Sequence, residues 1–98
     1  MQTSDKRVLR RINKERQYQM KRNEVYLKLN EVFRDVFDDD SITVNDSTTA
    51  DDIEDWDSLE HINLMMAVQK AFKIKLSMGE ISGLKNVGEL VDILEKRA

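Results

Sequence analysis

The sequence of 98 residues contains no cysteine and no proline, and it has a single histidine. Without cysteine the chain forms no disulfide bond, carries no thiol nucleophile and offers no thiolate ligand for zinc. Any metal site would depend on carboxylates, and no apolar run approaches the roughly 20 residues of a membrane-spanning helix. The start also lacks the apolar centre of a secretory signal. We therefore expect a small cytoplasmic protein without a large enclosed active site.

Charge is distributed unevenly along the chain. Basic residues outnumber acidic ones in residues 1–22, whereas acidic residues predominate in the remainder. Residues 1–19 have too few apolar side chains for a core, and we expect a basic leader that is disordered or non-native, with Met20 as a hypothetical natural start. A nucleic-acid or membrane arm and a targeting segment remain alternatives for this leader. Residues 20–98 form the expected domain, which should avoid nucleic acid and seek basic partner surfaces.

Apolar periodicity predicts four helical segments. The first covers about residues 23–37, with Asn23 as N-cap, and the second covers residues 58–73, with an apolar arc wider than one neighbour covers. That arc indicates a central helix, a face kept for a partner or ligand, or both. A short helix follows Ser77, and a final one begins near Val87. No hairpin signal is present, so the sequence predicts an all-α fold, a small bundle of three main helices plus one short helix.

A long acidic loop, residues 38–57, connects the first two predicted helices. Its only sizeable aliphatic residues are Ile42, Val44 and Ile53, and it has no glycine. A calcium loop of the EF-hand type needs oxygen ligands at alternating positions and a glycine at the sixth, and the sequence fits neither requirement. We expect a solvated loop anchored by its few apolar side chains, and no metal site.

The second helix begins at a serine. Asp57 is a good N-cap, Glu60 has the spacing of its capping-box partner, and Ser58 is then the first helical residue. A side chain there lies beside unpaired backbone N–H groups and the positive end of the helix dipole. This position favours a phosphate ester on Ser58.

A hydrolytic triad of Ser58, His61 and Asp57 is the enzymatic alternative. It would also need an oxyanion site, and no glycine-rich elbow surrounds Ser58. We therefore predict no catalytic residue. His61 is interpreted as a surface residue that touches Trp56, and Trp56 as an apolar staple at the helix entrance.

Three stretches resemble the acyl carrier proteins. They are Asp57-Ser58-Leu59, the apolar run Met65–Phe72, and Val87-Gly88-Glu89-Leu90-Val91 at the opening of the last helix. The resemblance covers about residues 21–97, in the family's order of helices.

The resemblance implies that Ser58 carries 4′-phosphopantetheine, added by a phosphopantetheinyl transferase, and that acyl groups are held as thioesters on this arm. The reactive sulfur would then belong to the prosthetic group, which suits a chain without cysteine. Asp57, Leu59, Glu60 and Ile62 match the region that carriers present to the transferase and to acyl-activating, acyltransferase or synthase enzymes with basic docking surfaces. The chain would be a monomeric, non-catalytic carrier.

Trp56 departs from the pattern of fatty-acid-synthesis carriers, and so do Gln69, Lys70 and Ala71. These residues favour a specialised carrier, for example one serving polyketide, nonribosomal-peptide or D-alanylation pathways, including a D-alanyl or aminoacyl carrier. The alternative from another class is an unmodified acidic helical interaction domain.

Overall fold

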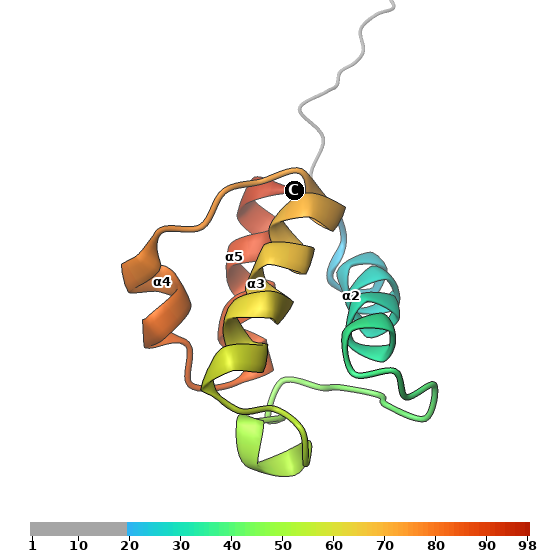
Figure 1. Ribbon diagram of the computed structural model, residues 1–98. Helices are drawn as coiled ribbons and strands as arrows, with labels where there is room; N and C mark the ends of the chain where they lie inside the picture. Colours follow the sequence, from blue (N-terminus) through green and yellow to red (C-terminus); the bar gives the residue numbers. More distant parts are fainter. Residues whose placement is uncertain (1–19) are drawn as a thin grey trace, which may run out of the picture.

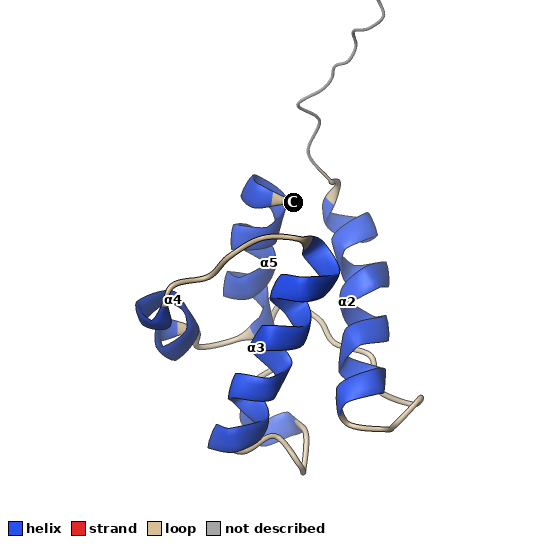
Figure 2. Ribbon diagram, turned by 45° about the horizontal axis from the view of Figure 1, so that its top comes forward, coloured by secondary structure: helices blue, strands red, loops and turns tan. Residues whose placement is uncertain are grey.

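Four α-helices and one short 3-10 helix make up the computed structural model, which describes residues 20–98 (Figures 1 and 2). The helices are α2 (Arg22–Val36), α3 (Ser58–Phe72), α4 (Met78–Gly83) and α5 (Val87–Arg97), and the 3-10 helix η1 spans Ala50–Asp52. No strand occurs among these residues. The predicted all-α bundle of three main helices and one short helix is confirmed. The proposed leader, residues 1–19, lies outside the described residues.

The three long helices pack side by side around one apolar core, while α4 lies beside α3 and α5 (Figure 1). Each contributes side chains that are almost fully buried, as the periodicity predicted. These are Val25, Leu29 and Phe33 from α2, Leu64, Met65 and Val68 from α3, and Val87, Leu90, Val91 and Leu94 from α5. Since α3 packs between its neighbours, its interpretation as a central helix is confirmed. Leu59 and Met66 of the same arc stay exposed, and a partner or ligand for that face stays a prediction.

The first helix begins earlier than predicted. Its first residue is Arg22, and the carboxylate of Glu24 accepts a hydrogen bond from the backbone N–H of Lys21 at 2.9 Å. Asn23 therefore lies inside the first turn, and its prediction as N-cap is wrong. The physical reason is that Glu24, at the third helical position, bonds back to the N–H of Lys21 and so fixes Lys21 as the residue in front of the helix.

A network of charges fixes this helix start against the rest of the domain. The guanidinium of Arg22 contacts Asp46 of the acidic loop at 2.7 Å, and on α5 it contacts Asp92 at 2.9 Å and Glu95 at 2.5 Å. These hydrogen bonds raise the pKa of Arg22 above its ordinary value. Burial and a hydrogen bond to Asp46 raise the pKa of Tyr26 to about 12. One arginine thus joins α2, the loop and α5.

Backbone contacts attach the acidic loop to the start of α5. The N–H of Val87 donates to the carbonyl of Thr48 at 2.8 Å, and the N–H of Gly88 donates to the carbonyl of Asp46 at 3.0 Å. A β-carbon on Gly88 would lie 2.8 Å from that same carbonyl oxygen, so only glycine allows this approach. Val44 is buried as predicted, and the loop also contains η1, which the sequence did not indicate.

The contact at Gly88 gives a test of how the loop is attached. Gly88→Ala should lower the free energy of unfolding by about 1–3 kcal/mol, because the new methyl group overlaps a backbone carbonyl that cannot turn away without breaking its hydrogen bond. Urea or thermal unfolding followed by circular dichroism measures the change.

The matched control is Gly79→Ala, whose β-carbon would meet no atom closer than 4.0 Å. Its stability should stay equal or rise by up to about 1 kcal/mol, through helix propensity alone. Equal effects of the two substitutions would show that the loop contact does not constrain residue 88.

Candidate functional site

The start of α3 places Ser58 at the surface of the domain. Asp57 is the N-cap, and its carboxylate accepts a hydrogen bond from the backbone N–H of Glu60 at 2.8 Å. Ser58 is exposed, and no hydrogen bond to its hydroxyl occurs among residues 20–98. The N–H groups of Ser58 and Leu59 have no acceptor within the helix, because they belong to its first turn. The hydroxyl therefore lies free beside the positive end of the helix dipole.

Only half of the predicted capping box forms. The Glu60 carboxylate accepts from the side chain of Asn63 at 3.3 Å, while the N–H of Asp57 donates to the carbonyl of Asp55 at 3.1 Å. The N–H of Asp57 already donates within the turn before the helix, so it does not donate to the Glu60 carboxylate as the capping box requires. Its carboxylate remains on the surface near Ser58.

Trp56 anchors the entrance of α3 in the core. The centroid of its indole ring lies 5.3 Å from that of the Phe33 ring, in an edge-to-face arrangement, and 6.2 Å from that of the Phe37 ring. On its other side the indole stacks on His61, with ring centroids 5.9 Å apart. The predicted contact between Trp56 and His61 is confirmed, as is the role of Trp56 as an apolar staple.

His61 is more deeply involved than a surface residue. The indole N–H of Trp56 donates to Nδ1 of His61 at 3.1 Å, and Nε2 of His61 lies 2.9 Å from the carbonyl oxygen of Ile81 in α4. An indole N–H only donates, so we assign the neutral tautomer with its proton on Nε2, which donates to Ile81. The prediction of His61 as a surface residue is wrong, because both ring nitrogens are used inside the fold.

This geometry also removes the hydrolytic alternative. A general base must accept the proton of its nucleophile. Nδ1 of His61 already accepts from Trp56, and Nε2 carries the proton, so His61 has no lone pair for Ser58. The Asp57 carboxylate caps the helix instead of orienting the imidazole.

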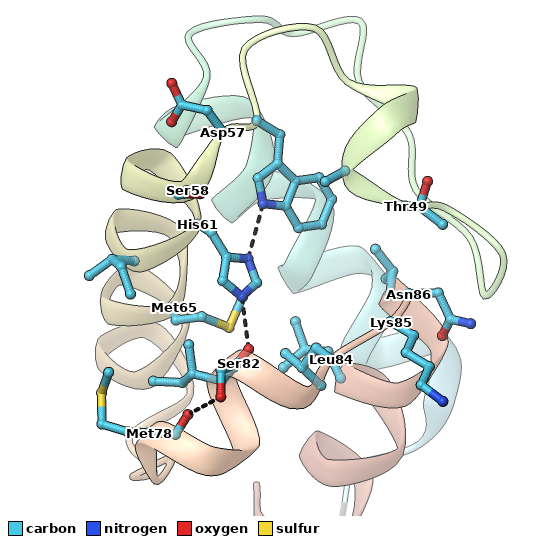
Figure 3. Close-up of a pocket in the computed structure, with 16 residues that line it drawn as sticks. Thr49, Asp57, Ser58, His61, Met65, Met78, Ser82, Leu84, Lys85 and Asn86 are labelled. Atoms are coloured by element: carbon cyan, nitrogen blue, oxygen red, sulfur yellow. Dashed lines mark hydrogen bonds between the residues drawn. The ribbon is translucent and has the colours of Figure 1, made fainter.

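A pocket of about 480 Å³ opens beside Ser58, between α3 and α4 (Figure 3). Its walls are mostly apolar, and the size is within the range of small-molecule sites. The apolar lining comprises Ala50, Trp56, Ile62, Met65, Met78, Ile81, Leu84, Val87 and Leu90. The polar residues Thr49, Lys85 and Asn86 lie along one side (Figure 3). Ser58 lies at its rim.

An apolar surface continues outside the pocket. Leu59 is 68% exposed and Met66 63% exposed on α3, and Ile62 is exposed between them. Met78 of α4 is 68% exposed and lines the same pocket as Ile62, and the acidic residues Asp57 and Glu60 lie in the first turn region of α3 beside Leu59 in the sequence. The sequence indicated Leu59 and Ile62. It did not indicate that Met78 would lie at this site, because in the sequence Met78 is only the first residue of a predicted short helix.

Among residues 20–98, no group of three or more histidine, aspartate and glutamate side chains could hold a metal ion. No helix in this part of the chain is long and apolar enough to cross a membrane.

Comparisons with known proteins agree with this geometry. The family profile described as "Phosphopantetheine attachment site" matches residues 28–94. An acyl carrier protein of Petrotoga mobilis is 32% identical over 80 residues, which are 80% of this chain and 92% of the relative. The chain belongs to the acyl carrier protein family. The solution NMR structure of a holo acyl carrier protein from Geobacter metallireducens matches with a TM-score of 0.70 and 46% identity, over 74% of this chain and 84% of that one.

As an acyl carrier protein, the chain has 4′-phosphopantetheine as its prosthetic group. The start of α3 suits such a group, because it presents an exposed hydroxyl, open backbone N–H groups for a phosphate and an adjacent apolar pocket. When bound, the group supplies a thiol for thioester chemistry, which the cysteine-free chain lacks. The chain's own residues provide the attachment point, the charge and the shape around it.

An ion pair holds α4, the far wall of the pocket, in addition to the hydrogen bond from His61. The Glu80 carboxylate accepts hydrogen bonds from the guanidinium of Arg97 on α5 and from the N–H of Ser77 at 2.9 Å. The Arg97 contact, with the Ser77 N–H second, lowers the pKa of Glu80 from 4.5 to about 2. A carboxyl group whose pKa is lower in the folded than in the unfolded protein stabilises the fold at any pH above its unfolded-state pKa. This stability is lost as the pH falls toward the folded-state pKa.

Glu80→Gln should therefore lower the melting temperature at neutral pH and flatten its fall between about pH 5 and about pH 2 relative to wild type. Thermal unfolding across this pH range measures the slope. Asp39 and Asp46 also have lowered pKa values, but they are present in both proteins and cancel in the comparison. Parallel pH curves for the two proteins would mean that the Arg97 contact does not hold α4.

Proposed function

We propose that Ser58 is the attachment residue and that a phosphopantetheinyl transferase modifies it with coenzyme A. The Ser58 oxygen would form an ester bond to the phosphorus of the phosphopantetheinyl half, and the anhydride bond to the adenosine bisphosphate half would break. The hydroxyl proton would pass to a base on the transferase. The observation that supports this proposal is the exposed, unpaired hydroxyl at the first residue of α3, beside an apolar pocket.

The acidic and apolar side chains around Ser58 suit a docking role. We propose Asp57, Leu59, Glu60 and Ile62 as contacts for the transferase and for acyl-activating, acyltransferase or synthase enzymes with basic docking surfaces. Charges at a rim mainly steer association, whereas an exposed apolar side chain that fills a partner's pocket contributes affinity. We place this monomeric carrier, residues 20–98, in the cytoplasm with the coenzyme A that would modify it.

Trp56 supports a specialised pathway instead of general fatty acid synthesis. An aromatic ring before the attachment serine makes one wall of the pocket rigid, since it is packed on Phe33 and Phe37. A rigid wall favours one cargo shape over a range of chain lengths. The cargo would be an acyl, aryl or aminoacyl thioester delivered between dedicated enzymes.

Modification of Ser58 is tested by incubating the protein with a promiscuous phosphopantetheinyl transferase and coenzyme A. Intact-protein mass spectrometry should show the addition of one phosphopantetheinyl group to the wild type and none to Ser58→Ala. Ser82→Ala is the matched control, because Ser82 is exposed on the opposite wall of the same pocket, and it should be modified like the wild type. A wild type that gains no mass would favour the unmodified interaction domain.

The docking surface is tested with Leu59→Ala. Leu59 is 68% exposed, so its loss should leave folding unchanged, yet it should lower the transferase kcat/KM about tenfold, as expected for one apolar contact residue. Leu27→Ala is a matched control with 69% exposure on α2, and it should have no effect.

Asp57→Asn separates charge from capping at the same surface. Asparagine caps helices as well as aspartate does, so stability should stay close to that of the wild type while the salt dependence of transferase binding becomes weaker.

For the apolar part of the surface, equal transfer rates for Leu59→Ala and Leu27→Ala would place the docking surface elsewhere.

A further inference from the structure

The imidazole of His61 lies across the pocket, in the space between α3 and α4. One bond joins it to Trp56 on the near side and another to the carbonyl of Ile81 on the far side. Figure 3 shows the ring between two groups of lining residues. Asp57 and Ser58 lie on one side of it, and Met65, Met78 and Leu84 lie on the other.

The space beyond the imidazole is apolar and ends in the core. Met65 is 1% exposed and Leu90 2% exposed at this end, so neither side chain gives way without opening the bundle. Met78 is 68% exposed and unbranched, and it can move. The inner part of the pocket can therefore accept an apolar chain, provided that the chain passes His61.

Passing the imidazole disrupts several contacts at once. Both ring nitrogens would lose their partners, the indole N–H of Trp56 would lose its acceptor, and the stacking on Trp56 would end. Buried polar groups left without partners oppose such a movement. A short acyl group needs no such disruption, because it can lie on the Ser58 side of the imidazole, in the part of the pocket that Trp56 also lines.

We propose that His61 determines cargo length in this carrier, and that the cargo is a short acyl group held on the Ser58 side of the imidazole. This inference rests on the proposed function of the pocket beside Ser58. It assigns to His61 and Trp56 together a role in selecting cargo, in addition to their packing role. The carrier would then shield short thioesters and leave the distal part of longer chains in water.

The test loads wild type and His61→Ala with acetyl, butyryl, hexanoyl and octanoyl thioesters and measures their cleavage by hydroxylamine. Each methylene that becomes buried should slow cleavage roughly fourfold. In the wild type this slowing should stop after butyryl, whereas in His61→Ala it should continue through octanoyl. Identical chain-length series in the two proteins would overturn the inference.

Two further variants separate the effect of His61 on cargo length from a general loss of stability. Trp56→Phe keeps an aromatic ring but removes the N–H donor, so it should release His61 partly and give an intermediate series. Asn63→Ala changes an exposed residue of the same helix outside the pocket and should behave like the wild type. An Asn63→Ala series that matches His61→Ala would also overturn the inference.

A second readout does not need Ser58 to be modified. Free acyl-pantetheines are titrated into the unmodified protein, and the indole N–H resonance of Trp56, the single tryptophan of the chain, is followed by NMR. Octanoyl-pantetheine should bind His61→Ala more than tenfold tighter than wild type, as expected from two or more additional buried methylenes. Equal affinities would contradict the role of His61, while absence of mass gain at Ser58 would contradict only the attachment proposal.

Discussion

The hydrogen-bonded pair of Trp56 and His61 joins the parts of this fold that matter for function. The indole packs on Phe33 and Phe37 in the core, the imidazole belongs to α3, and its second bond reaches Ile81 in α4. Through this chain of contacts the apolar core fixes the angle at which α3 starts and the distance at which α4 lies. The exposed Ser58 and the adjacent pocket both follow from that arrangement.

Much of the fold could be predicted from local rules. The start of α3 at Ser58, the cap by Asp57 and the short helix after Ser77 depend on side chains within a few residues of one another. Apolar spacing also identified the core face of every long helix. The wrong assignment of Asn23 as N-cap is itself local, because Glu24 bonds back to Lys21. The contacts that no local rule indicated join distant residues: Arg22 contacts Asp92 and Glu95 of α5, and Gly88 contacts Asp46.

The site shows the same division. Sequence motifs indicated Ser58 and its acidic and apolar neighbours, since these residues are contiguous. They could not indicate that His61 bonds to the backbone of Ile81, twenty residues further on. Every residue has a backbone carbonyl, so the residue type does not show which carbonyl accepts the bond. Nor could the motifs place Met78 beside the same pocket as Ile62, which depends on how α4 lies against α3.

Attachment of the prosthetic group to Ser58 can be tested on the protein purified from its native cells. Tandem mass spectrometry of its proteolytic peptides locates the modification. We expect one phosphopantetheinyl group, on the Ser58 hydroxyl of the peptide that contains Asp57-Ser58-Leu59. A group attached to another hydroxyl, or a Ser58 peptide that is unmodified throughout growth, would contradict it.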